Sequence, residues 1–87
     1  MELKILDFMG TWCQPCKTMS PILDEVEKET GVEIRKIDVD DNEEMVIAYE
    51  IRNIPTLIFI KDNEIVDKVT GTISKEILIN KINEYSK

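Results

Sequence analysis

The chain contains no histidine, and it has only two cysteines, three glycines, three prolines and one tryptophan. Without histidine, no imidazole is available as a catalytic base or as a metal ligand. Two cysteines alone do not complete a four-thiolate zinc site within one chain. The scarcity of glycine and proline, with 43% hydrophobic and 33% charged residues, indicates a folded globular protein rather than a disordered one.

The length of 87 residues leaves room for one small core, so we expect residues 1–87 to form a single domain. Eighteen acidic against eleven basic residues give a net charge of −7, which repels phosphate backbones and anionic lipid surfaces. No signal-peptide core follows the N-terminus, and no apolar run approaches the roughly 20 residues that span a bilayer. We therefore expect a cytoplasmic protein, a monomer, without nucleic-acid or membrane partners.

Hydrophobic periodicity predicts alternating strands and helices along the chain. Strands are predicted at 3–9, 32–39, 56–60 and 64–70. Helices are predicted at 15–30, at 45–49 with residues 40–42 as caps and Glu43 and Glu44 suited to the first turn, and after Ser74. This order, βαβαββα, predicts an α/β fold with a mixed four-stranded sheet and three helices on both faces. Gly31 ends the first helix, which continues through Pro21 with a kink.

The segment Trp12-Cys13-Gln14-Pro15-Cys16 stands at the junction of the first strand and the first helix. Cysteines at this spacing lie about one helical turn apart, within the roughly 4.4–6.8 Å between Cα atoms that a disulfide requires. Pro15 suits the first helical position, so Cys13 falls at the helix N-terminus, where unpaired N–H groups and the helix dipole stabilise a thiolate. We expect Cys16 to lie one turn inside and to be less exposed. The pattern predicts that Cys13 attacks a disulfide and that Cys16 resolves the mixed disulfide.

Two other uses of this cysteine pair remain open from spacing alone. A C-x-x-C pair is often half of a metal site, which here requires a second chain because the sequence has no further cysteine or histidine. A purely structural disulfide is disfavoured, because a reducing cytosol breaks it and so short a loop removes little entropy from the unfolded chain.

Several separately placed motifs accompany the pair: Asp7-Phe8 before it, Lys17 and Pro21 after it, then Ile54-Pro55-Thr56 and Gly71. Together, over essentially the whole chain, they resemble the thioredoxin family. Most thioredoxins have an additional N-terminal strand and helix, so the chain is similar to short archaeal-type thioredoxins, which are close to glutaredoxins in size. Gln14 stands where the family usually has glycine, at a position that tunes redox potential and partner choice.

The resemblance implies a protein-disulfide reductase that needs no cofactor for the exchange. Its implied partners are disulfide-containing client proteins and a thioredoxin reductase or another electron donor. The histidine of the family's oxidising members is missing, which favours a reductant. A glutaredoxin-like protein served by a low-molecular-weight thiol is the alternative, disfavoured by Trp12, by the Ile-Pro-Thr order and by few basic residues near the pair. A non-enzymatic partner-binding or metal-binding module also remains open.

Asp7 is a charge on an otherwise apolar strand, and an unpaired buried carboxylate costs several kcal/mol. The thioredoxin resemblance implies a buried carboxyl with a raised pKa that accepts the proton of Cys16 through a water molecule. In the alternatives, Asp7 reaches solvent at the strand end or is neutralised by Lys36 on the neighbouring strand. We expect a catalytic Asp7 with Lys36 as its modulator.

The other candidate residues form an expected substrate-binding surface. The resemblance implies a cis Ile54-Pro55 peptide opposite the cysteines, with the Ile54 backbone free to pair with an extended substrate segment. Gly71 is expected to allow close approach of a substrate backbone. Trp12 is expected to shield the site and to offer an apolar surface, rather than to lie in the core. Gln14 and Pro15 complete the expected surface.

Overall fold

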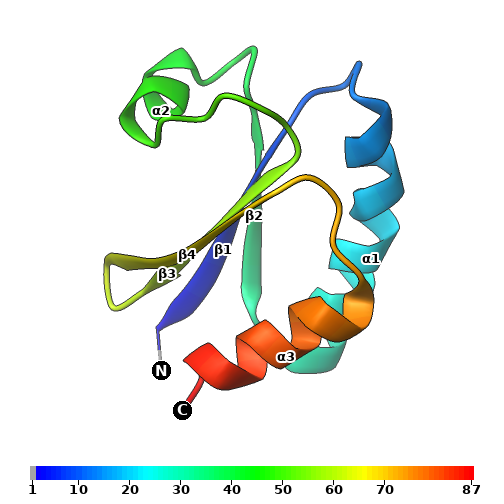
Figure 1. Cartoon of the computed structure of the whole chain (residues 1–87), viewed down its shortest axis with the longest axis vertical. Helices are drawn as coiled ribbons and strands as arrows, with labels where there is room; N and C mark the ends of the chain where they lie inside the picture. Colours follow the sequence, from blue (N-terminus) through cyan, green and yellow to red (C-terminus); the bar gives the residue numbers. More distant parts are fainter. Residues whose placement is uncertain (1) are drawn as a thin grey trace.

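One four-stranded sheet with helices on both faces makes up the fold (Figure 1). The computed structural model describes residues 2–87. Its elements are β1 (Leu3–Met9), α1 (Gln14–Thr30), β2 (Glu33–Asp38), α2 (Glu43–Ala48), β3 (Thr56–Lys61), β4 (Glu64–Thr70) and α3 (Lys75–Tyr85). Helices α1 and α3 cover one face and α2 the other, so the expected βαβαββα fold is confirmed.

The strands lie in the order β2-β1-β3-β4. Strand β1 pairs in parallel with β2 and antiparallel with β3, and β3 pairs antiparallel with β4. The tight turn between β3 and β4 has positive φ angles of 51° at Asp62 and 69° at Asn63, which residues of this type tolerate best after glycine. The central position of β1 brings its carboxyl end to the middle of one edge, where α1 begins.

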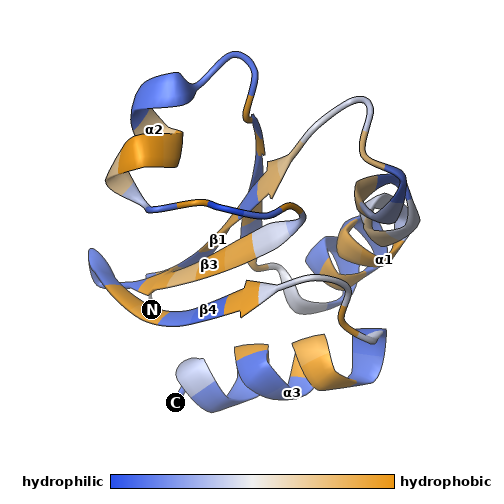
Figure 2. Ribbon diagram, turned by 45° about the horizontal axis from the view of Figure 1, so that its top comes forward, coloured by the Kyte–Doolittle hydropathy of each residue, from blue (hydrophilic) through white to orange (hydrophobic). Residues whose placement is uncertain are grey.

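Side chains alternate along β1 between two hydrophobic clusters. Leu3 and Ile5 belong to the cluster that packs against α1 and α3, whereas Leu6 and Phe8 belong to the cluster on the side of α2. Figure 2 shows that hydrophobic residues of α1 and α3 form the sides of these helices nearest the sheet. By the same alternation, Asp7 is directed to the α1 side, the face on which the cysteines begin.

Helix α1 begins one residue earlier than predicted, because Cys13 is the N-cap and Gln14 the first helical residue. The helix continues through Pro21, as expected, and ends at Gly31. Gly31 has a φ of 75°, the left-handed conformation that glycine adopts at lowest cost at a helix C-terminus. Helix α1 therefore carries the cysteines at one end and is terminated by local sequence at the other.

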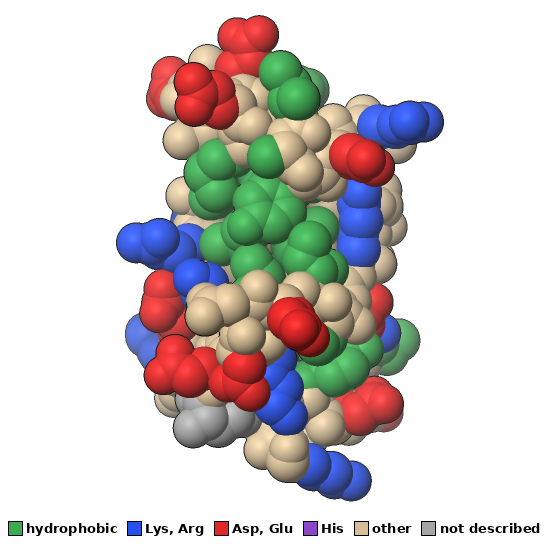
Figure 3. Space-filling model, turned by 90° about the vertical axis from the view of Figure 1, so that its left-hand side faces the viewer, with side chains coloured by type: hydrophobic (Ala, Val, Ile, Leu, Met, Phe, Trp, Pro, Cys, Tyr) green, Lys and Arg blue, Asp and Glu red, His purple; other side chains and the backbone are tan. Residues whose placement is uncertain are grey.

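Helix α2 has the two glutamates expected in its first turn but lacks the expected N-cap hydrogen bond. It begins at Glu43, and the Asn42 side chain makes no capping hydrogen bond, since its Nδ2 donates to the carbonyl of Asp38, 2.9 Å away. The Asn42 side chain therefore closes the β2–α2 loop instead of capping the helix. Figure 3, which views the side of α2, shows hydrophobic side chains gathered in the middle of the face and acidic ones above them. No helix within residues 2–87 combines the length and apolarity needed to cross a membrane.

Candidate active site

A disulfide joins Cys13 to Cys16 at the start of α1, with 5.3 Å between the Cα atoms. The turn before the helix is closed by the Cys13 N–H, which donates to the Gly10 carbonyl at 3.1 Å. The Cys16 N–H donates to the Sγ of Cys13 at 3.2 Å. Cys13 therefore stands at the helix N-terminus, as expected, and a backbone N–H of the first turn points at its sulfur.

The expected difference in exposure between the two cysteines is absent. Cys13 is 4% exposed and Cys16 6%, so both are buried in the disulfide form. The prediction that Cys16 is the less exposed of the two is wrong for this state. A physical reason is that two bonded sulfurs each cover part of the other's surface.

Asp7 is buried, with 4% of its surface exposed. Burial raises the pKa of its carboxyl to about 6, and the positive charge of Lys36 opposes this effect. The Lys36 ammonium itself bonds to Ser20 Oγ at 3.0 Å and to Asp24 Oδ1 at 3.3 Å on α1. The burial of Asp7 contradicts the alternative in which it reaches solvent at the strand end. Lys36 acts on Asp7 through its charge, but this does not cancel the effect of burial, because the pKa stays raised.

Trp12 lies on the surface beside the disulfide, with 65% of its area exposed. Its indole Nε1 donates to Asp40 Oδ2 in the loop before α2, at 2.9 Å. A Cβ at Gly10 would lie 3.0 Å from the indole and 3.1 Å from Cδ1 of Ile54, so glycine lets these two side chains approach the chain. The indole is therefore held between the β1–α1 and β2–α2 loops.

A groove of about 340 Å³ begins at Trp12, the residue before Cys13. Its lining is Trp12, Val39, Val46, Ile51, Arg52, Asn53 and Ile54. The Ile54-Pro55 peptide is cis, as the family resemblance implied, and Pro55 is buried. The groove is largely apolar and open, which suits an extended peptide segment.

Gly71 is joined to this region through its N–H, which donates to the Pro55 carbonyl at 2.8 Å. Its φ of 92° is a conformation that residues with a side chain rarely adopt, while a Cβ placed there would meet nothing within 4 Å. The backbone conformation, rather than crowding within the chain, accounts for glycine here. Gln14 and Pro15 are both exposed at the start of α1.

The structure thus brings the two cysteines, Trp12 and Ile54 to one edge of the sheet, with Asp7 on the adjoining stretch of β1. Sequence reasoning missed Gly10 and Asp40, which hold the indole, and Ser20 and Asp24, which hold Lys36. No local motif marks them, because each acts across elements that are distant in sequence. Within residues 2–87, no group of three or more acidic or cysteine side chains is placed to hold a metal ion.

Comparisons with known proteins agree with this geometry. The thioredoxin family profile matches residues 1–84. The thioredoxin of Staphylococcus epidermidis is 42% identical over 85 residues, which cover 95% of this chain and 82% of that protein. The thioredoxin of the alga Pyropia yezoensis is 41% identical over 83 residues, or 93% of this chain and 78% of that one.

Solved structures of thioredoxins also resemble this chain. A mutant thioredoxin from Halobacterium salinarum superposes with a TM-score of 0.94 at 33% identity, covering 98% of this chain and 75% of that one. The thioredoxin of Fasciola hepatica superposes with a TM-score of 0.89 at 36% identity, covering 97% and 81%. The chain therefore belongs to the thioredoxin family and is a thiol–disulfide oxidoreductase with the redox-active pair Cys13 and Cys16.

Proposed function

We propose that this oxidoreductase reduces disulfides of client proteins, with Cys13 as the nucleophile and Cys16 as the resolving thiol. The observation that carries the assignment is the position of Cys13 at the N-cap of α1, where the Cys16 N–H points at its sulfur. Cys13 is thus the sulfur whose thiolate is stabilised by the helix end. Among residues 2–87, no N–H donates in the same way to the sulfur of Cys16.

In the proposed cycle, the Cys13 thiolate attacks one sulfur of the client disulfide, and the other client sulfur leaves as a thiolate. Cys16 then loses its proton and attacks the Sγ of Cys13, which releases the second client thiolate and closes the Cys13–Cys16 disulfide. Two electrons pass to the client. An electron donor, a thioredoxin reductase or another dithiol, reduces the pair again.

Asp7 is the proposed acceptor of the Cys16 proton, through a water molecule. Its support is burial on the α1 side of β1 together with a pKa of about 6, which lets the carboxyl both take and return a proton near neutral pH. Lys36 is the proposed modulator, since its charge lowers the pKa of Asp7.

Client binding is proposed along the groove lined by Trp12 and Ile54. An extended client segment would pair with the Ile54 backbone and pass close to Gly71, while its side chains contact the exposed indole and the start of α1 at Gln14 and Pro15. We place this cycle in the cytoplasm, where thiols are kept reduced. The protein then acts as a monomer, one client at a time.

Cys16→Ser tests the division of labour. Without the resolving thiol, Cys13 should remain in mixed disulfides with client proteins, visible on a non-reducing gel, and reduction of insulin in the presence of dithiothreitol should be lost. Cys13→Ser is the matched control and should form no such adducts. If Cys16→Ser turns over normally, or if Cys13→Ser traps clients instead, the roles are misassigned.

A further inference from the structure

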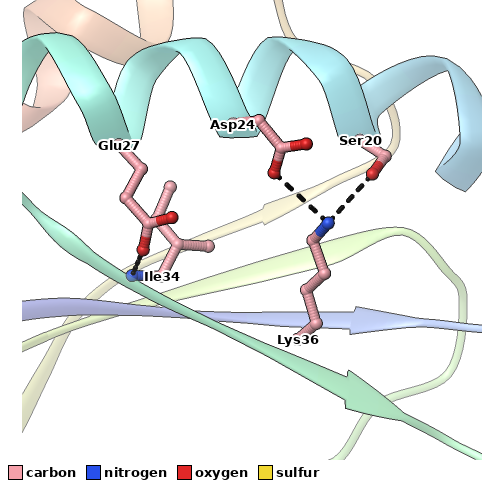
Figure 4. A network of polar contacts seen from close by, with 5 residues as sticks. All are labelled: Ser20, Asp24, Glu27, Ile34 and Lys36. Carbon is pink, nitrogen blue, oxygen red and sulfur yellow. Dashed lines mark hydrogen bonds and ion pairs between the residues drawn. The ribbon is translucent and has the colours of Figure 1, made fainter.

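The side chain of Lys36 connects the strand that lies beside Asp7 to the surface of α1 (Figure 4). Lys36 and Asp7 are Cα partners in the parallel β1–β2 ladder, so their side chains leave the sheet on the same face. A lysine stem is long enough to reach a carboxylate on the neighbouring strand. Its ammonium instead bonds to Ser20 and Asp24, at 3.0 and 3.3 Å.

The two anchors continue the face of α1 that carries Cys16. Cys16, Ser20 and Asp24 are spaced four residues apart, which places them one above another along a helix. The line runs from the buried sulfur to the exposed carboxylate that pairs with Lys36. Lys36 therefore sits between two acidic side chains, and only the one on α1 bonds to it.

Few other charges face the Asp7 carboxyl. On β3 its ladder partner is the apolar Leu57. From α1 and β2 the ionisable groups on this side are Cys16, Asp24, Glu27 and Lys36, and in the disulfide form Cys16 does not titrate. On α3 the buried residues are the apolar Leu78 and Ile82.

Asp67 of β4 is also directed to this side of the sheet. Its carboxylate accepts hydrogen bonds from Lys81 and Tyr85 of α3, both at 2.7 Å, so these three groups satisfy one another. The Lys36 ammonium is therefore the main charge near Asp7 whose position can change.

We propose that Ser20 and Asp24 are positioning residues that hold the Lys36 ammonium on α1 and so prevent it from pairing directly with Asp7. The inference rests on the proton-accepting role proposed for Asp7. A direct ion pair would favour the charged carboxylate and lower its pKa, since an opposite charge at close range does so by about 1–3 units. The Asp7 carboxylate would then accept a proton only well below neutral pH.

The test is an NMR titration of the Asp7 carboxyl carbon in the oxidised protein, where neither cysteine titrates. The Asp7 signal is assigned by its loss in Asp7→Asn. Ser20→Ala removes one anchor without changing charge, and it should lower the pKa of Asp7 by about 0.3. Asp24→Asn removes the charged anchor and should lower it by about 0.5 or more.

Glu27→Gln is the matched control for the charge change. Glu27 also projects from α1 toward β2, but its Oε2 accepts from the backbone N–H of Ile34 at 3.1 Å and does not touch Lys36 (Figure 4). This variant should leave the pKa of Asp7 within about 0.2 of its original value. In a Lys36→Met background, Ser20→Ala should have no effect and the effect of Asp24→Asn should fall to that of Glu27→Gln.

An unchanged pKa in Ser20→Ala and Asp24→Asn would overturn the proposal. A higher pKa would do so as well, because it would mean that the anchors draw the ammonium toward Asp7 rather than away. The titration is independent of activity. If the pKa falls but the pH dependence of insulin reduction does not move with it, the positioning is supported and the catalytic role of Asp7 fails instead.

Discussion

At the scale of single residues, the strongest constraint on the site is the burial of Asp7. A carboxyl with 4% of its surface exposed and a pKa of about 6 is ionised at neutral pH in an environment that disfavours its charge. The unfolded chain, with a pKa of 3.8, holds that proton less tightly. Protein stability therefore depends on the same group that the proposed mechanism uses.

We predict that Asp7→Asn stabilises the protein at pH 7. Because the pKa is higher in the folded state, the favourable contribution of the protonated carboxyl is complete below about pH 4 and is lost as the pH rises through about 6. The shift from 3.8 to about 6 corresponds to a gain of up to about 3 kcal/mol in the variant. Urea unfolding of both proteins at pH 3.5 to 8 measures it.

The gain should vanish at the acid end, and Asp41→Asn, a change at an exposed neighbour of α2, should stay within about 0.5 kcal/mol throughout. A gain that is equal at every pH would show that Asp7 is not buried as an ionisable group.

In the same series, Asp7→Ala should slow insulin reduction mostly at neutral and lower pH. An unchanged rate from pH 6 to 8 would remove Asp7 from the mechanism.

Asp40 restrains the side chain of Trp12 through a hydrogen bond to the indole. Asp40→Ala removes the acceptor of the indole N–H, so the ring should move more freely and the fluorescence anisotropy decay of this tryptophan should show a larger fast component. Trp12 is the only tryptophan, so the signal is unambiguous. We expect the KM for a protein disulfide to rise about two- to fivefold, with kcat little changed.

Asp41→Ala is the control, because it removes the same charge from the adjacent residue, which makes no contact with the indole. Equal anisotropy in the two variants would mean that the hydrogen bond does not restrain the ring in solution.

At the scale of helices and strands, the sequence predicted those features that depend on interactions between residues close together in the chain. The strand β1, the Gly31 stop of α1 and the Asp62-Asn63 turn follow from side-chain pattern and backbone preference, and the structure confirms them. Asn42 misled because the same side chain can cap a helix or close a loop, and here the Asp38 carbonyl is its partner. Which of the two hydrogen bonds forms depends on the tertiary structure around Asn42, and a short stretch of sequence does not contain that information.

The residues of the candidate site also differ in whether the sequence alone could predict them. The cysteine pair, Trp12 and Asp7 stand out because their residue types are unusual where they occur. The burial of Cys13 and the anchoring of Trp12 by Asp40 depend on how separate loops meet, so the sequence alone could not indicate them. The cis Ile54-Pro55 peptide was expected only from the family resemblance.

Helix α3 provides a test of capping at this scale. Ser74 is its N-cap, and its Oγ accepts the Ile77 N–H at 3.2 Å. Ser74→Ala should lower the free energy of unfolding by about 1 kcal/mol, whereas Ser74→Gly should cost only a few tenths. Chemical denaturation measures both, and Thr72→Ala, two residues earlier and exposed, should have little effect. A Ser74→Ala variant as stable as the parent would contradict the capping bond.

At the scale of the whole molecule, net charge opposes folding. Eighteen acidic residues against eleven basic ones leave a charge of −7, and repulsion among like charges destabilises a compact state. The ion pairs of Lys75 with Glu25 and Glu29 link α1 to α3 but lie on the surface, where they contribute little. Repulsion therefore dominates the response to salt.

We predict that raising NaCl from about 0.02 M to about 0.5 M increases Tm, because screening weakens the repulsion. The increase should be a few degrees, since about 1 kcal/mol corresponds to about 4–8 °C in a domain of this size. Calorimetry measures it, and a Glu43→Gln and Glu44→Gln double variant should gain less from salt. A Tm that falls with salt would mean that attractive pairs outweigh the net charge.

The alternation of side chains along β1 ties folding accuracy to chemistry. A slide of this strand by a single residue would turn Asp7 toward α2 and Phe8 toward the cysteines, while leaving a chain that still pairs its backbone. Such a misaligned product would be compact and could still close its disulfide, yet it would lack the proton acceptor that we propose. On that mechanism, the correct register of the central strand is required for full turnover, in addition to the two cysteines.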